Sequence, residues 1–224
     1  MDRDRLLMEA GGRSKKEGER PAAYDRKSEI YQKALDLFAK DGYDATSMSV
    51  IAETLGMSKA NLYYYCSSKE NLLYQIHLNF LQKHIIPILD EMEKLPDPAD
   101  RVVLFLRRCT LLNTSNRANR TLVHEAHRLD RSHRNEIALI WRRAYEAVRD
   151  SIKELQQSGR ARKFNESFLT FMWFGAVFWV VYWFDYSRQV NAEELAEVIA
   201  QSFLNSLIPE APDATRGVKK MHPK

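Results

Sequence analysis

Residues 34–73 read ALDLFAKDGYDATSMSVIAETLGMSKANLYYYCSSKENLL and carry the clearest structural pattern of the chain. Apolar residues recur at helical spacing on both sides of Gly56. Gly56 and Met57 together predict a tight turn between two short helices. Ser58 then begins the second helix, because a serine hydroxyl can accept a hydrogen bond from the free N–H groups of a helix N-terminus. This pattern predicts a helix-turn-helix over residues 46–65.

The sequence before and within the motif predicts two further helix boundaries. A helix is expected over residues 25–40, and Asp41 and Gly42 should end it. Either Thr46 or Ser47 can cap the first helix of the motif.

After the motif, the chain is expected to continue as helices. Ser67 and Glu70 have the spacing of a capping box, which predicts a longer helix to about residue 91. Pro87 should kink that helix near its end, because proline lacks the N–H of a helix interior. Residues 96–98 (Pro-Asp-Pro) mark the clearest internal boundary. Further helices are expected over residues 98–114, 117–130, 134–157, 165–187 and 191–207.

The whole chain is therefore expected to be all-α. Strand-type alternation is nearly absent, and the prolines and glycines fall mainly in the tails and at helix ends. The composition, with 45% hydrophobic and 29% charged residues, is that of a globular protein. The predicted domains are a flexible basic arm (1–24), a three-helix head (25–75), a larger helical domain (76–208) and a disordered tail (209–224).

The head closely resembles the DNA-binding domain of the tetracycline-repressor family of bacterial regulators. The matching positions are Phe38, Gly42, Thr46, Ile51, Ala52, Gly56, Ser58, Leu62, Tyr63, Lys69 and Leu72. Cys66 departs from the pattern, since the family usually has an aromatic residue there; a plain buried thiol is favoured over a redox switch. The resemblance implies a cytoplasmic repressor that binds a palindromic operator in double-stranded DNA as a homodimer. It also implies a small-molecule effector in the second domain, which releases the DNA.

The second helix of the motif is the element expected to enter the major groove. Lys59 and Asn61 can reach base edges or phosphates, and tyrosine hydroxyls can bond phosphate oxygens. The basic stretch 11–27 either follows phosphates or is a solvated tail. The candidate DNA-binding residues are Thr46, Ser47, Ser58, Lys59, Ala60, Asn61, Tyr63, Tyr64 and Lys69.

Residues 101–149 contain eleven arginines, no lysine and only four acidic residues. The planar guanidinium group of arginine can donate two hydrogen bonds to a phosphate. Arginines beside apolar helices therefore predict a site for an amphiphile such as acyl-CoA. This domain also resembles the family's acyl-CoA-responsive branch. Two alternatives are that most of these arginines pair with surface carboxylates, or that the effector is a drug-like compound. The candidate effector-binding residues are Arg107, Arg108, Leu111, Trp141, Arg142, Tyr145, Trp173, Phe174 and Phe178.

Residues 168–184 form an uncharged apolar run that approaches the roughly 18–20 residues of a membrane span. The run is short, its aromatic residues are spread along its length, and an amphipathic helix follows. We therefore favour a helix buried between the domain core and a partner subunit. A membrane-associated helical protein remains one alternative, and a helical interaction module that binds no DNA is another.

Other chemistry is not indicated. The two cysteines are too few for a disulfide framework, and His124, His127 and His133 lack the further ligands of a metal site, so no metal or cofactor is expected. No phosphate-binding glycine loop or nucleophile motif is present, so an enzyme is not expected. The first twenty residues lack the apolar stretch of a signal peptide, in keeping with a cytoplasmic location.

Overall fold

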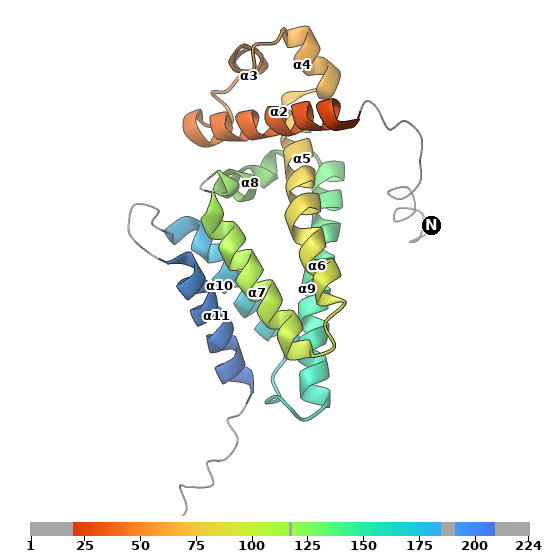
Figure 1. Ribbon diagram of the computed structural model, residues 1–224, viewed down its shortest axis with the longest axis vertical. Helices are drawn as coiled ribbons and strands as arrows, with labels where there is room; N and C mark the ends of the chain where they lie inside the picture. The colour runs from red at the N-terminus through yellow and green to blue at the C-terminus, as the bar shows by residue number, and fades with distance from the viewer. Residues whose placement is uncertain (1–19, 117, 185–190, 209–224) are drawn as a thin grey trace, which may run out of the picture.

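The computed structural model describes residues 20–116, 118–184 and 191–208. All regular secondary structure in these ranges is helical, which confirms the all-α prediction. The head consists of α2 (Arg20–Asp41), α3 (Met48–Thr54) and α4 (Lys59–Tyr65). Figure 1 shows α3 and α4 on the same side of α2, at one end of the molecule.

The local signals of the helix-turn-helix act as predicted. The hydroxyl of Ser47 caps α3 by accepting from the N–H of Val50 at 3.2 Å. Ser58 caps α4 in the same way, accepting from the N–H of Asn61 at 3.1 Å. Between the two helices, Gly56 has a φ of 61°, a conformation that glycine adopts without strain. The break between α3 and α4 is therefore built into the sequence.

The long helix after the head differs from the prediction in two places. Its cap is Ser68, which accepts from the N–H of Asn71 at 2.9 Å, so the predicted capping box at Ser67 is wrong by one residue. The helix runs as α5 (Lys69–Phe80), a π-helical turn (Leu81–Ile85) and α6 (Ile86–Met92). The irregularity thus precedes Pro87, whose ring crowds the carbonyl of the residue four positions earlier.

The body is arranged around one helix. Helix α7 packs against α6, α9, α10 and α11, and Figure 1 shows it crossing the body obliquely. The side chains of Phe105 on α7 and Phe203 on α11 are completely buried in this core. The elements of the body are α7 (Pro98–Ser115), α8 (Asn119–Glu125), a 3-10 turn η2 (Ala126–Arg128), α9 (Arg131–Gln157), α10 (Glu166–Trp183) and α11 (Ala192–Leu207).

Several predicted boundaries shift. Helix α2 begins at Arg20, so part of the predicted flexible arm is helical, and the predicted helix over 117–130 is divided between α8 and η2. Asp97 and Asn191, at the starts of two of the predicted helices, cap α7 and α11 by accepting hydrogen bonds from backbone N–H groups. Most of the predicted arm and the whole predicted tail lie outside the described residues.

Helix α10 contains most of the uncharged apolar run of the sequence. It is the one helix among the described residues that is long and apolar enough to cross a membrane by length and composition. Only 22% of it is buried within the chain. Four large exposed side chains lie at helical spacing along one stripe, the α10 apolar face: Phe168, Met172, Trp179 and Trp183.

Candidate functional site

Helix α4 presents a polar, exposed surface at the end of the molecule. The side chains at its N-terminal end, Lys59 and Asn61, are exposed. Tyr64 is 85% exposed, whereas Leu62 is completely buried and holds the helix against the head. Such a helix can enter a groove with one face while the other packs on the domain. The predicted residues Ser58, Ala60 and Tyr63 are exposed on the same element.

Two predicted contacts have structural roles in the turn before α3. Thr46 is only 1% exposed, and its hydroxyl donates to the carbonyl of Gly42 at 2.8 Å, so its side chain does not reach the surface as predicted. The ammonium of Lys69 lies 4.2 Å from the centre of the Tyr43 ring and donates to the Asp44 carbonyl at 3.4 Å. Partial burial lowers the pKa of Lys69.

Cys66 ends α4 as a packed thiol. It is 3% exposed, and its thiol donates to the Leu62 carbonyl at 3.5 Å. Burial raises the pKa of this thiol to about 11. Because the thiolate is the reactive form, this environment favours the interpretation of Cys66 as a core residue.

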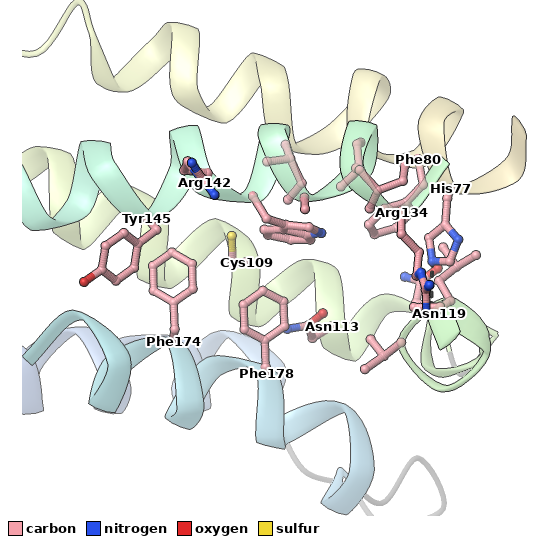
Figure 2. Close-up of a pocket in the computed structure, with 18 of the residues that line it drawn as sticks. His77, Phe80, Cys109, Asn113, Asn119, Arg134, Arg142, Tyr145, Phe174 and Phe178 are labelled. Carbon is pink, nitrogen blue, oxygen red and sulfur yellow. Dashed lines mark hydrogen bonds between the residues drawn. The ribbon is translucent and has the colours of Figure 1, made fainter. Parts of the chain in front are cut away.

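A large apolar cavity lies within the body, between α5, α7, α8, α9 and α10 (Figure 2). Its volume of about 700 Å³ is in the range of small-molecule sites. Leu81 and Ile85 of the π-helical turn line it, so the irregular part of the long helix forms part of the wall. Among the described residues that line the cavity, none is acidic and two, Arg134 and Arg142, are arginines.

The remaining polar groups of the cavity wall are uncharged or tied to the backbone. The Nε2–H of His77 donates to the Leu122 carbonyl at 2.6 Å, and burial lowers the pKa of His77 to about 4. The side-chain amide of Asn119 donates to the Leu112 carbonyl at 3.1 Å. The imidazole of His77 is therefore neutral at physiological pH. Arg134 and Arg142 are the permanently charged residues of the described lining.

Five of the predicted effector-binding residues line this cavity. They are Trp141, Arg142, Tyr145, Phe174 and Phe178. Figure 2 shows Tyr145 and Phe174 toward one end, with Phe178 further along the same wall. Phe171, Phe174 and Phe178 of α10 line the cavity, whereas Phe168, Trp179 and Trp183 lie on the α10 apolar face.

The other four predicted residues do not line it. Arg107 pairs with Glu197 at 2.6 Å, and Arg108 pairs with Glu91 at 3.1 Å. Trp173 packs edge-on against Phe203 in the core, with ring centres 5.5 Å apart. Leu111 is likewise absent from the cavity lining. The structure therefore places these four predicted residues outside this cavity.

The arginine-rich segment as a whole is not a phosphate cluster. Arg101 pairs with Glu154 at 2.7 Å, and Arg143 pairs with Glu93 at 2.7 Å, each across two helices. The alternative, that many of these arginines pair with carboxylates, is therefore confirmed for these residues. Sequence reasoning missed His77, Asn119 and Arg134, because nothing local shows that their helices converge on one cavity.

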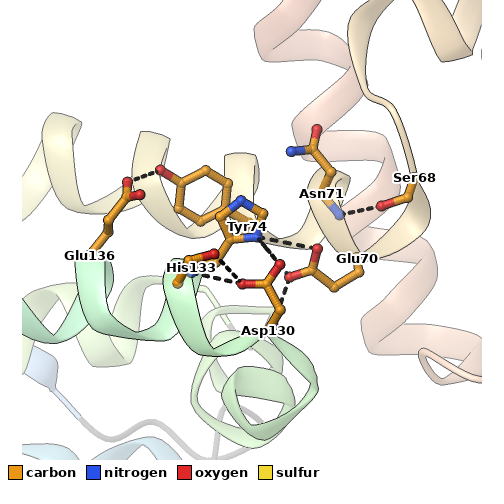
Figure 3. A network of polar contacts seen from close by, with 8 residues as sticks. Ser68, Glu70, Asn71, Tyr74, Asp130, His133 and Glu136 are labelled. Carbon is orange, nitrogen blue, oxygen red and sulfur yellow. Dashed lines mark hydrogen bonds and ion pairs between the residues drawn. The ribbon is translucent and has the colours of Figure 1, made fainter.

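A polar network joins the head to the body where α5 meets α9 (Figure 3). His133 Nδ1 lies 2.9 Å from a carboxylate oxygen of Glu70, and the backbone N–H of Asp130 donates to Glu70 at 3.0 Å. The Tyr74 hydroxyl donates to Glu136, and the pKa of Tyr74 is raised by burial and by this hydrogen bond. Glu70, Asp130 and His133 lie close enough to hold a metal ion, but hydrogen bonding among them already explains their spacing.

A second contact joins the head to the same part of the body. Arg128 of η2 pairs with Asp44 of the head at 2.5 Å. The neighbouring residues His127, Leu129 and Arg134 line the cavity. The segment between α8 and α9 therefore contacts the head on one side and the cavity on the other.

Comparison with known proteins identifies both halves of this arrangement. Residues 30–76 match the model of the bacterial regulatory proteins of the tetR family, and residues 95–207 match a tetracyclin repressor-like C-terminal domain. The HTH-type transcriptional regulator RutR of Escherichia coli is 37% identical over 78 residues, which are 34% of this chain and 37% of RutR. The chain thus matches little more than a third of that relative's length.

Solved structures share the whole fold. The structure of AibR in complex with isovaleryl coenzyme A and operator DNA aligns with a TM-score of 0.71 and 24% identity, over 79% of this chain and 97% of AibR. PfmR of Thermus thermophilus, described as a TetR family transcriptional regulator, aligns with a TM-score of 0.73 and 26% identity, over 78% of this chain and 96% of PfmR. With both family models matched in order, the chain belongs to the tetracycline-repressor family of bacterial regulatory proteins.

Proposed function

We propose that this protein is a ligand-responsive transcriptional repressor that binds a palindromic operator as a homodimer. The observation that carries the proposal is the separation of two surfaces on one chain. One is the exposed polar helix α4, and the other is an apolar cavity that shares a wall with the contacts holding the head. An operator-binding protein that is not an enzyme accounts for both.

The DNA contacts are proposed to come from the exposed N-terminal half of α4. Asn61 and Lys59 are the side chains offered to base edges and phosphates, with the hydroxyls of Tyr63 and Tyr64 on phosphate oxygens. Ser47 and Ser58 are placed at the helix N-termini, where free N–H groups favour a phosphate.

The homodimer is proposed to form through the α10 apolar face. Large aromatic side chains such as Trp179, 61% exposed, and Trp183, 72% exposed, form a patch of the kind that marks an interface. A second copy covering this face would place two heads side by side, so that two α4 helices could reach successive major grooves about 34–36 Å apart. Membership of a family of bacterial regulators favours this interpretation over a membrane span.

The effector is proposed to be an amphiphile in the cavity, with an acyl-CoA thioester as the compound class. The wall is almost entirely apolar, and the two arginines supply positive charge. The solved complex of AibR holds isovaleryl coenzyme A together with operator DNA, so the same fold accommodates both kinds of ligand in that protein. A drug-like effector is the competing proposal, and the apolar wall alone would suit it.

Release of DNA is proposed to pass through the segment between α8 and α9. An effector that displaces this segment also displaces Arg128, which pairs with Asp44 of the head. It moves the adjoining start of α9 as well, where His133 contacts Glu70 at the start of α5. The ligand would then favour one spacing of the heads over another, which is the requirement for allosteric coupling.

Binding of the full-length protein to DNA from upstream of its own gene tests the function. We expect affinity that exceeds that for shuffled DNA of equal length and falls steeply with salt. Equal affinity for both DNAs at every salt concentration would contradict the proposal. Dodecanoyl-CoA, added to the preformed complex, should release the DNA.

A further inference from the structure

The two arginines of the cavity differ in their surroundings. Figure 2 shows Arg134 at the same end as His77 and Asn119, while Arg142 lies nearer Tyr145 among aromatic residues. Among the described residues, neither arginine forms an ion pair with a carboxylate, in contrast to Arg107 and others that point away from the cavity.

The end of the cavity at Arg134 has the chemistry of an anion site. His77 and Asn119 make it polar, yet both use a side-chain N–H for a backbone carbonyl, so they leave Arg134 as the available charged donor. No acidic side chain lines the described wall to compete for it. A guanidinium can offer two parallel N–H groups to a carboxylate or phosphate.

We propose that Arg134 binds the anionic group of the effector, whose apolar chain extends along α10 toward Tyr145. The inference rests on the proposed effector cavity and specifies which end of the effector lies where. It makes Arg134, rather than Arg142, the residue that selects an acid over a neutral compound of the same length. The anionic group is a carboxylate of a free acid or a phosphate of a thioester; the two share the same recognition.

The position of Arg134 also connects binding to the head. Arg134 follows His133 directly in the first turns of α9, and His133 contacts Glu70 of α5. An anion drawn to Arg134 therefore acts on the helix turn that holds the head. Binding at this end is expected to release DNA, whereas an apolar chain that fills only the Tyr145 end is not.

Calorimetric titration of the full-length protein tests the proposal with dodecanoate, dodecanol and dodecanoyl-CoA as probes. The variants are Arg134→Gln, Arg142→Gln at the other arginine of the cavity and, as a matched control on the same helix but outside the cavity lining, Arg131→Gln. We expect Arg134→Gln to weaken binding of at least one of the two anionic probes by tenfold or more, the scale of a charge-assisted hydrogen bond. Arg142→Gln should weaken binding of that probe by less than Arg134→Gln does, and the control Arg131→Gln should change it less than threefold. Dodecanol should bind more weakly than that anionic probe.

The outcomes separate the proposals. Tighter binding of dodecanoate than of dodecanol identifies a free acid as the effector class, and tighter binding of dodecanoyl-CoA than of dodecanol identifies a thioester. Either result supports Arg134 as the anion-binding residue when Arg134→Gln abolishes the difference in affinity. Equal effects of Arg134→Gln and Arg142→Gln, an equal effect of the control Arg131→Gln, or dodecanol binding as tightly as the anions would overturn the role of Arg134 and leave the cavity as the effector site. If none of the three probes binds, both the anion site and the amphiphile-responsive cavity are contradicted.

Discussion

The imidazole of His133 lies flat against the ring of Tyr74, with ring centres 3.8 Å apart and planes inclined by 10°. His133 belongs to α9 of the body and Tyr74 to α5, which leads out of the head. The stacked pair lies beside the contact between His133 and Glu70, so one small cluster fixes the angle between the two parts. Figure 3 shows the cluster bridging the two helices.

Loss of the Glu70 carboxylate should weaken this connection. Glu70 is 27% exposed and His133 is 20% exposed, so their contact is shielded from water. We expect Glu70→Gln to lower the free energy of unfolding by about 1–2 kcal/mol, measured by urea denaturation at fixed protein concentration. The control Glu91→Gln removes a more exposed pair with Arg108 and should cost less than about 0.5 kcal/mol. Equal costs would refute a special role for the cluster.

The buried His77 should make stability depend on pH. Its pKa in the folded protein, about 4, lies below the ordinary value of 6.5, so the unfolded chain binds a proton first as pH falls. The contribution of neutral His77 is therefore present above pH 6.5 and is lost as the pH drops toward 4. Between pH 6.5 and 5 we expect a loss of roughly 2 kcal/mol in the wild type beyond that in His77→Gln. If the unfolding free energies of the wild type and His77→Gln change in parallel with pH, the pKa of His77 is not lowered in the folded protein.

Ser68, rather than its neighbour, should stabilise the start of α5. Its hydroxyl accepts the hydrogen bond of the N-terminal turn, while Ser67 is exposed. Ser68→Ala is expected to cost about 1 kcal/mol of unfolding free energy in thermal or urea denaturation. Ser67→Ala should stay within about 0.5 kcal/mol of the wild type. A larger loss of unfolding free energy for Ser67→Ala than for Ser68→Ala would instead identify Ser67 as the cap, as the sequence pattern predicted.

The α10 apolar face should hold two copies together. Trp179 is exposed on the single chain, and a charge at that position would be buried without a partner in a dimer. We expect Trp179→Glu to sediment as a monomer in analytical ultracentrifugation at concentrations where the wild type is a dimer. Val123→Glu, an equally simple change of an exposed apolar residue on α8, should leave the dimer intact. A monomeric wild type would contradict the proposed interface.

The head could be predicted from sequence because its signals are local. Ser47, Gly56 and Ser58 act on backbone groups within one or two helical turns. The predicted start of the second helix at Ser58 and the predicted end of the motif at residue 65 agree with the bounds of α4. Thr46 was predicted as a surface residue because its position in the sequence does not reveal that its hydroxyl donates a hydrogen bond to the Gly42 carbonyl.

The cavity was only partly predictable, for a physical reason. The aromatic residues of α10 mark an apolar surface from composition alone, and Phe174 and Phe178 do line the cavity. Whether an arginine pairs with a carboxylate or lines the cavity depends instead on which residues a distant helix brings close to it. Arg107, for example, pairs with Glu197 of α11. Because that information lies in tertiary packing, the sequence alone does not show that Arg134, unlike the other arginines near it, lines the cavity.

A single affinity measurement can show whether α4 reads operator DNA. Fluorescence anisotropy would compare the wild type, Asn61→Ala and the control Gln82→Ala on DNA from upstream of the protein's own gene. Asn61 is exposed on α4, and Gln82 is an exposed amide on the body. We expect at least a tenfold loss of affinity for Asn61→Ala, the scale of a lost base contact, and none for Gln82→Ala. Wild-type affinity in Asn61→Ala, Lys59→Ala and Tyr64→Ala alike would contradict it.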